Sequence, residues 1–273
     1  MGVPVDRDAL IAAVERSPRA AAAHDRAGWV RLFTADGRIE DPVGSRPHVG
    51  HEQIGRFYDT FIGPRDITFR RDLDIVSGAV VLRDLVLEVS MGPAVTMHIP
   101  AFLRYDLRED LREDLRESNG QWLVAELRAY WELPAMMLQF LRAGPPAVPP
   151  ALQLSRALSG NQGLRGAVGF AAGFRRAGAR RRKLVDAFLA AVARGDAAAA
   201  RALSAPGTLT LGDRRPLGAG ELVERLHGAR PTKTITAGPT ITVSLDSARG
   251  RGILFADLGV RADTIHRIRY FPA

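Results

Sequence analysis

Four long segments in which apolar and polar residues alternate follow one another between residues 67 and 133, and three helix-like segments precede them. Alternation with a period of two is typical of strands that bury one face. The strands are expected at 67–76, 79–90, 94–107 and 121–133, and the helices at 6–23, 26–33 and 51–61. Helices that come first and strands that come afterwards predict an α+β fold, with the helices packed on one face of a curved antiparallel sheet.

The same order recurs in the second half of the chain. A helix is expected at 184–196, and residues 196–226 repeat the outline of 25–58, with Gly218 opening a helix as Gly50 does. In the first half, Asp25 is expected to cap the short helix at 26–33. Shorter strands are expected at 232–238, 240–246, 251–260 and 264–271. The chain is therefore predicted to contain two tandem copies, the second smaller. The expected division is a first domain at 1–135, a linker at 136–180 and a second domain at 181–273.

The predicted linker is basic. Residues 133–185 contain no acidic side chain and include the proline-rich stretch AGPPAVPPAL, and the net charge is −4 for residues 1–150 but +12 for 151–273. Such a tract is typical of weak contact with an anionic membrane, here through residues 156–183, or of a partly helical connector packed on the acidic first domain. Its phenylalanines fit a helix core better than a base-stacking platform, so no nucleic-acid partner is expected.

Composition excludes several classes of site. The chain has no cysteine, which rules out disulfides, thiolate metal sites and cysteine nucleophiles. Its six histidines do not have the spacing of a zinc site, and no glycine-rich phosphate loop occurs, so we expect neither a metal nor another cofactor. No apolar run reaches the length of a membrane span and no signal peptide is recognised, so a cytoplasmic location is expected. The tetrapeptide DLRE, repeated at 106, 110 and 114, is expected to form a solvated insertion.

The stretch VRLFTADGRIEDPVGSRPHVGHEQIGRFYDTF, at residues 30–61, is the most distinctive in the chain. It resembles the bacterial ketosteroid isomerases and their SnoaL-like relatives in the NTF2-like superfamily, and the resemblance extends over about residues 10–132, with a weaker second copy over about 181–273. It implies a cone in which a strongly curved sheet wraps a long helix and encloses an apolar cavity. An apolar small molecule is the substrate that such a cavity implies.

The resemblance also implies roles for particular residues. Asp41 corresponds to the family's general base, which moves a proton next to a ketone, and Tyr58 corresponds to a tyrosine of the hydrogen-bond network. Trp131 falls where an aromatic residue lines the cavity. Further pocket residues are expected to be Met97, Phe102, Phe57 and Tyr130.

The sequence departs from the family at the oxyanion hole. In ketosteroid isomerases a tyrosine and a protonated aspartic acid hold the developing oxyanion, and the aligned positions here are Ser17 and Ala101. Any donor must come from elsewhere. Besides Tyr58 and Tyr130, the side chains considered for this role are His98, Tyr105 and Glu132. Strand alternation points His98 away from Met97 and therefore outward.

Three functions remain open on these residues. The first is cofactor-free acid–base catalysis of the isomerase, polyketide-type cyclase or epoxide-opening kind, with Asp41 as base, although not the standard ketosteroid isomerase reaction. The second is a non-catalytic pocket for a sterol-like or polyketide-like ligand, and the third is a structural or dimerisation module.

The second copy is expected to be inactive. It places Thr208, Leu209 or Thr210 where the first has Asp41, and its nearest acid is Asp213. Such a copy could take the place of a dimer partner. The chain is therefore expected to be a monomer with paired domains, or a homodimer.

Overall fold

The computed structural model describes residues 6–92, 94–110, 121–162, 178–259 and 264–273. The chain divides into two compact units, Met1–Gly173 and Phe174–Ala273, and each unit has its own hydrophobic core. Residues 111–120, which hold the DLRE run after Asp110, and residues 163–177 of the basic tract lie outside the described residues. The first repeat, residues 106–109, lies in a strand and not in the expected insertion.

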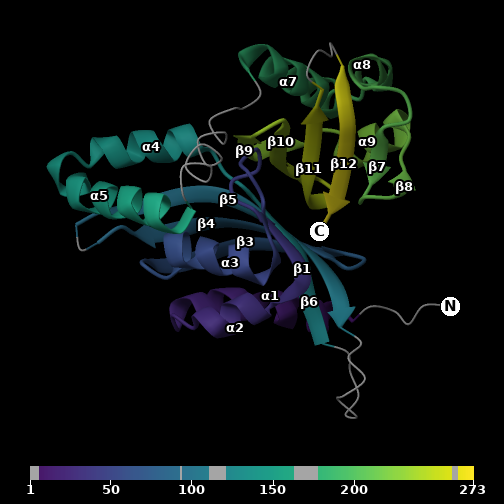
Figure 1. The fold of residues 1–273 in the computed structure, drawn as a ribbon. Coiled ribbons are helices and arrows are strands. Elements are labelled where there is room, and N and C mark those ends of the chain that lie inside the picture. The colour runs from purple at the N-terminus through teal and green to yellow at the C-terminus, as the bar shows by residue number, and fades with distance from the viewer. Residues whose placement is uncertain (1–5, 93, 111–120, 163–177, 260–263) are drawn as a thin grey trace. The chain divides into compact units, whose positions relative to one another are not determined.

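The first unit is a six-stranded sheet with helices on one face (Figure 1). Its strands are β1 (Phe33–Glu40), β2 (His48–Val49), β3 (Asp66–Ser77), β4 (Val80–Ser90), β5 (Thr96–Asp110) and β6 (Gln121–Tyr130). The helices before the long strands are α1 (Arg7–Ala22), α2 (Arg26–Arg31), α3 (Gly50–Phe57) and the π-helical turn η1 (Tyr58–Ile62). The predicted α+β class, with helices first and long strands afterwards, is confirmed.

The strand order is β2-β1-β6-β5-β4-β3. The neighbours from β3 to β6 are antiparallel, as expected, but β1 runs parallel to β6. A purely antiparallel sheet is therefore a wrong expectation. Strands β3 to β6 form a four-stranded antiparallel meander, and β1 precedes this meander in the chain. The last strand of the meander, β6, lies beside β1 and runs in the same direction.

Side chains near the helix ends explain where the first helices begin. Asp6 caps α1 by accepting a hydrogen bond from the backbone N–H of Asp8 at 3.0 Å. Asp25 caps α2 through the backbone N–H of Gly28 at 2.7 Å, which confirms the predicted cap. Such caps satisfy backbone donors that a helix leaves free at its start.

A buried arginine ties α1 to the sheet. Arg83 of β4 is 1% exposed, and its guanidinium donates to both carboxylate oxygens of Asp74 at 2.8 and 2.9 Å and to Glu15 of α1 at 2.6 Å. Because a buried charge without partners is costly, this group fixes the helix against β3 and β4.

Two further helices follow β6. They are α4 (Leu133–Arg142) and α5 (Val148–Ala157), joined by the 3-10 turn η2 (Pro145–Ala147), and α5 runs into the π-helical turn η3 (Leu158–Gln162). Phe140 and Ala147 are buried in the first core, and Met136 and Leu154 pack against it. The segment predicted to be a linker therefore begins with elements of the first unit.

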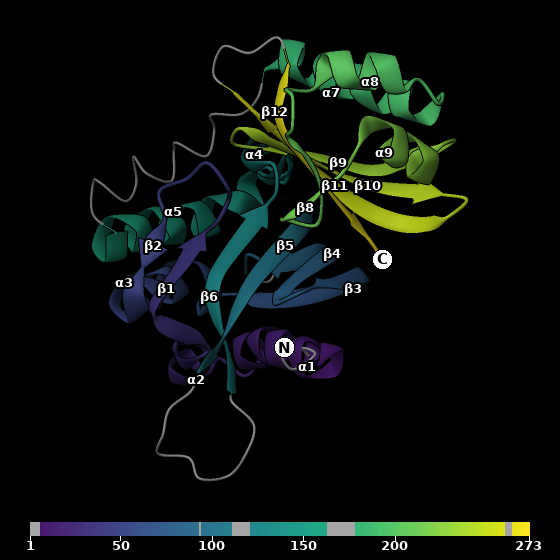
Figure 2. The same ribbon diagram turned by 90° about the vertical axis from the view of Figure 1, so that its right-hand side faces the viewer.

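The second unit repeats the plan of the first at smaller size, as Figure 2 shows from another side. Its helices are α7 (Ala179–Ala193), α8 (Ala197–Leu203) and α9 (Ala219–Leu226). Its strands are β7 (Leu209–Leu211), β8 (Arg215–Pro216), β9 (Arg230–Ala237), β10 (Thr240–Ser247), β11 (Gly250–Leu258) and β12 (Ile265–Pro272). The order β8-β7-β12-β11-β10-β9, with β7 parallel to β12, matches the first sheet strand for strand. Two tandem copies are confirmed.

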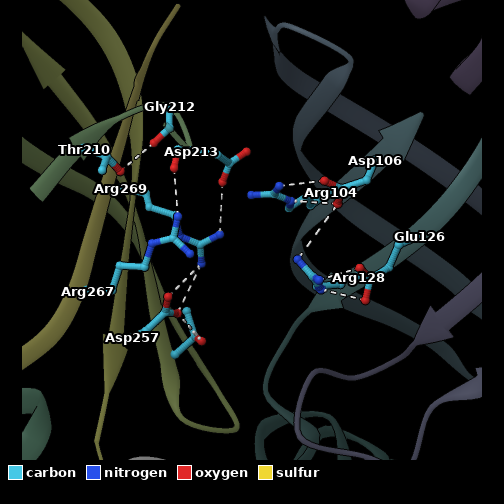
Figure 3. A network of polar contacts seen from close by, with 11 residues as sticks. Arg104, Asp106, Glu126, Arg128, Thr210, Gly212, Asp213, Asp257, Arg267 and Arg269 are labelled. Carbon is cyan, nitrogen blue, oxygen red and sulfur yellow. Dashed lines mark hydrogen bonds and ion pairs between the residues drawn. The ribbon is translucent and has the colours of Figure 1, made fainter. Parts of the chain in front are cut away.

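Charged residues on β5 and β6 are paired on the face of the first sheet that points away from α1–α3. The Arg104 guanidinium donates to the Asp106 carboxylate at 2.6 and 2.8 Å, and the Arg128 guanidinium donates to the Glu126 carboxylate (Figure 3). Within the second unit, the same figure shows Arg269 bonded to Asp257 at 3.0 Å. These arginines have carboxylate partners within their own unit, so they are structural cations.

Candidate functional site

Asp41 lies directly after the last residue of β1. The parallel register pairs Glu40 with Arg128 of β6, and the backbone N–H of Val43 donates to the carbonyl of Ala129 at 2.8 Å. These contacts place the Asp41 side chain beside the end of β6. There the indole N–H of Trp131 donates to the Asp41 carboxylate at 2.5 Å.

Glu40, the other acid of the motif, is engaged elsewhere. Its carboxylate accepts the backbone N–H of Gly44 at 2.9 Å and lies 3.6 Å from the Arg38 guanidinium. The two adjacent acids therefore differ: one stabilises the turn and the other lines a cavity.

The environment of Asp41 disfavours its charged form. Burial raises the pKa of the Asp41 carboxyl from 3.8 to about 6, although the hydrogen bond from Trp131 lowers it in part. Desolvation is a common way to bring the pKa of a carboxyl toward the range where it serves as a proton acceptor near neutral pH.

Asp41 opens into an apolar pocket of about 110 Å³. The walls of this pocket come from α3, η1, β3, β4, β5, the end of β6 and the helices α4 and α5. The lining residues are Asp41, Phe57, Phe61, Ile62, Arg65, Ile67, Leu87, Val89, Met91, Met97, Ile99, Trp131, Met136 and Leu154. Apart from Asp41, Arg65 and the indole N–H of Trp131, these side chains offer apolar surface or a thioether, so the pocket suits an apolar molecule.

Arg65 is the cation of this pocket. Its Nη1 donates to the carbonyl of Thr60 at 2.7 Å, and its Nε lies 3.0 Å from the sulfur of Met91. Both partners are uncharged, and no carboxylate among the described residues lies within ion-pair distance of Arg65. Burial lowers the pKa of Arg65 from its ordinary value, but an arginine remains protonated at any physiological pH.

A second, polar cavity of about 220 Å³ adjoins the apolar pocket. Asp41 and Phe61 line both cavities. The other residues around the polar cavity are Ser45, Arg46, Pro47, His48, Glu52, Gln53, Arg56, Leu158 and Asn161. Asp41 therefore stands at the junction of a polar and an apolar space.

Three of the residues expected to form the pocket do line it, namely Phe57, Met97 and Trp131. Phe102 and Tyr130 do not. They are cross-strand partners on β5 and β6, and strand alternation places them on the opposite face from Met97 and Trp131.

The other expected donors lie away from the pocket lining. Tyr58 is 3% exposed and packs against Trp29 with ring centroids 5.4 Å apart. Burial raises the pKa of Tyr58. The Tyr58 hydroxyl has no hydrogen-bond partner among the described residues. Tyr105 is fully buried in the same core, which raises its pKa to about 12. Glu132 occupies the capping position of α4.

His98 points outward, as strand alternation predicts. Its side chain is 60% exposed and lies 3.7 Å from Glu88. The two positions aligned with the oxyanion hole also contribute no donor to the pocket. Ser17 is buried and accepts the indole N–H of Trp29 at 3.2 Å, and Ala101 is buried with an apolar side chain.

Sequence reasoning missed Arg65 and the polar cavity. Arg65 is one arginine among many, in a turn between η1 and β3, and no motif distinguishes it. His48 and Arg46 stand inside the distinctive EDPVGSRPHVG stretch. That position is the signal that could have drawn attention to them.

In the described part of the chain, no helix is long and apolar enough to cross a membrane, and no group of three or more His, Asp or Glu side chains there could hold a metal ion.

Comparison with known proteins gives a family match for the first unit. Residues 10–126 match the model of the Nuclear transport factor 2 (NTF2) domain. No curated protein matches the chain.

Many solved structures match part of this chain. One is RV0760c from Mycobacterium tuberculosis in complex with estradiol-17beta-hemisuccinate, at 26% identity over 46% of this chain and 95% of that one, with a TM-score of 0.39. Another is Delta 5-3-ketosteroid isomerase from Mycobacterium sp., at 26% identity over 47% and 96%, with a TM-score of 0.34. A third is an LEH-like epoxide hydrolase from M. tuberculosis, at 18% identity over 52% and 97%, with a TM-score of 0.40.

Proposed function

The first unit of this chain belongs to the NTF2-like superfamily, and on this basis we propose that it is a cofactor-free acid–base enzyme acting on an apolar small molecule, with Asp41 as the general base. The observation that carries the proposal is the Asp41 carboxyl itself. It lines an apolar pocket, it is oriented by Trp131 at 2.5 Å, and burial raises its pKa to about 6. At neutral pH such a group is largely deprotonated and is a stronger base than a free aspartate.

The reaction class follows from the two charged groups in the pocket. Asp41 takes a proton from a carbon next to a carbonyl group. The electron pair of that C–H bond forms the enolate double bond, and the carbonyl electron pair moves to oxygen. Asp41 then returns the proton to the same carbon or to another one, so that the step is a net isomerisation or exchange without oxidation.

Arg65 supplies the electrostatic partner in this proposal. An enolate in an apolar pocket needs a donor, and Ser17 and Ala101 offer none there. Arg65 lines the same pocket as Asp41, and its partners among the described residues, the carbonyl of Thr60 and the sulfur of Met91, are uncharged. A preorganised donor of this kind is worth about 10²–10³ in rate.

Epoxide opening is the second reaction that a specific observation favours. Asp41 also lines the polar cavity, together with Glu52 and His48. A water molecule or substrate hydroxyl in that cavity would have Asp41 as its base. The first reaction remains our main proposal because Asp41 is the single carboxylate among the described residues that line the apolar pocket.

Hydrogen–deuterium exchange tests the reaction class without knowledge of the product. A panel of apolar ketones, including steroid ketones and aryl diketones, is incubated in D₂O with the full chain, and deuterium at the carbons next to the carbonyl is measured by mass spectrometry. We expect exchange with the wild type and a loss of about 10²–10⁴ in Asp41→Asn.

Two variants separate catalysis from simple binding. Arg65→Gln should lose about 10²–10³ of the exchange rate while retaining affinity for an uncharged apolar dye, and the matched control Arg70→Gln, on an exposed arginine bonded to Glu88, should keep both. If no ketone exchanges while the dye binds equally to wild type and Asp41→Asn, the pocket is a carrier site and the proposed activity is wrong.

A further inference from the structure

The polar cavity adjoins the apolar pocket at Asp41. Asp41 and Phe61 line both the polar cavity of about 220 Å³ and the apolar pocket of about 110 Å³. A single elongated molecule can therefore have its apolar body in one space and a polar end in the other. The chemistry of the polar cavity then defines what that end can be.

Two guanidinium groups face the polar cavity. Arg56 of α3 is held by Glu52 one turn earlier at 2.6 Å. Arg46 is different, because no carboxylate among the described residues lies within ion-pair distance of it. An arginine that lines a cavity without such a partner can donate two parallel hydrogen bonds to the oxygens of a carboxylate, sulfonate or phosphate.

Ser45 gives a second, independent indication of a ligand. Its side chain lines the polar cavity and is 8% exposed. Its buried hydroxyl has no hydrogen-bond partner among the described residues. A buried hydroxyl without a partner costs about 1–3 kcal/mol, and a ligand oxygen beside Arg46 would provide the partner.

The other titratable groups at this cavity are one histidine and two acids. His48 packs against Phe57 with ring centroids 5.2 Å apart, and burial, together with the neighbouring Arg46, lowers its pKa to about 4. His48 is therefore neutral at physiological pH. The acids at the cavity are Asp41 and Glu52, and the Glu52 side chain is 79% exposed, so solvent screens much of its charge.

We propose that the polar cavity formed by Ser45, Arg46 and Arg56 is a subsite for an anionic group, so that the ligand of this protein is an amphipathic molecule with an apolar body and an acidic end. The proposal rests on the apolar pocket described above but not on catalysis. Arg46 binds the anion, Arg56 adds positive charge beside it, and the Ser45 hydroxyl donates to it. The apolar body passes Asp41 and enters the space lined by Met97 and Trp131.

A pair of fluorescent dyes tests the subsite. 8-Anilinonaphthalene-1-sulfonate and N-phenyl-1-naphthylamine share one apolar body and differ by a single sulfonate. We expect the full-length protein to bind the sulfonate dye more tightly. Arg46→Gln should reduce the affinity for the sulfonate dye about tenfold and leave the uncharged dye unchanged, as expected for the loss of one charge-assisted contact. The matched control Arg31→Gln removes an exposed charge outside both cavities and should change neither dye.

Two further variants test where the dyes bind. Met97→Trp fills the apolar pocket and should abolish binding of both dyes, with circular dichroism as the check on folding. Asp41→Asn removes a negative charge from the junction and should strengthen binding of the sulfonate dye. The subsite is overturned if Arg46→Gln weakens both dyes equally or weakens neither, or if Met97→Trp leaves sulfonate binding intact.

The dye experiment and the ketone-exchange experiment test the anionic subsite and the proposed activity separately. An Arg46-dependent preference for the sulfonate dye without any ketone exchange supports the subsite and contradicts the activity. Ketone exchange that depends on Asp41, together with equal binding of both dyes, supports the activity and contradicts the subsite.

Discussion

The charged form of the buried Asp41 carboxyl lowers the stability of the folded state. Its pKa of about 6 lies above the ordinary value of 3.8, so the folded state binds this proton more tightly than the unfolded state does. The contribution of Asp41 to stability is therefore largest below about pH 4 and declines as the pH rises through about 6. A shift of this size corresponds to at most about 3 kcal/mol, and partial exposure of the side chain reduces that figure.

The first prediction concerns the stability of Asp41→Asn. The amide removes the buried charge, and its oxygen can still accept the Trp131 N–H, so the free energy of unfolding at pH 8 should rise by about 1 kcal/mol. Urea denaturation at pH 8 and at pH 4 measures the effect. The gain in the free energy of unfolding should disappear at pH 4. If Asp41→Asn is less stable than the wild type at pH 8, the assignment of a buried carboxylate is contradicted.

The second prediction concerns the hydrogen bond to Trp131. This bond lowers the pKa of Asp41, so its removal in Trp131→Phe should raise that pKa further. The pH at which ketone exchange reaches half its plateau should move upward by about half a unit to one unit. The control is Trp122→Phe, which is outside both cavity linings and should leave the profile unchanged.

The motif pointed to Asp41 and the family resemblance pointed to Trp131, but neither pointed to Arg65. The EDPVGS stretch and the strand at 121–133 carry specific residues at specific positions, and the structure brings these two into contact. The position of the Arg65 guanidinium is set by two neighbours, the sulfur of Met91 and the carbonyl of Thr60. These contacts depend on packing between η1, β3 and β4, which residue spacing does not encode.

At the scale of the element, alternation along β5 predicts which side chains face the pocket. Met97 and Ile99 line it and His98 is exposed. The same rule, applied strictly, excludes Phe102, which resemblance to the family had placed in the pocket. Period-two parity along β5 was thus a better guide to orientation than residue type.

The segment after β6 was predicted less well because its prolines were read as breaks. Pro134 stands in the first turn of α4 and Pro149 in the first turn of α5. Proline is tolerated in that turn, where a helix has no use for the missing N–H. The resulting helices bring Met136 and Leu154 to the pocket.

The third prediction concerns the attachment of α1 to the sheet. Arg83→Ala would leave Asp74 and Glu15 without their buried cation and should cost about 3–5 kcal/mol in the free energy of unfolding. The matched control is Arg71→Ala, an arginine that also contacts Asp74 and Glu15 but has a side chain 51% exposed. Its effect should stay below about 1 kcal/mol. Equal losses in the two variants, by urea denaturation, would contradict a special role for Arg83.

At the scale of the whole molecule, the two units share a plan but not a site. Asp213, the acid nearest to the predicted position in the second unit, lies 3.5 Å from Arg269. In that unit β7 ends at Leu211 and is followed by Gly212, whereas β1 ends at Glu40 and is followed by Asp41. By strand position Gly212 therefore corresponds to Asp41, and the expected Thr208, Leu209 or Thr210 lie earlier in the chain. Membrane contact through residues 156–183 and the oligomeric state remain predictions.

The fourth prediction concerns the independence of the two cores. Phe188 is fully buried in the core of the second unit, so Phe188→Ala should destabilise that unit by about 3–5 kcal/mol. Calorimetry should then show a separate unfolding transition at lower temperature, and dye binding by the first unit should be unchanged below the second transition. Loss of dye binding in step with the lower transition would show that the units do not fold separately.

The most direct test of the central claim is the titration of Asp41 by carbon-13 NMR. Aspartate carboxyl carbons are labelled in the full-length protein, and the spectrum of Asp41→Asn identifies the missing signal. The account predicts a midpoint near pH 6 for that signal. A midpoint close to 3.8, the ordinary value, would contradict a buried proton acceptor at this position.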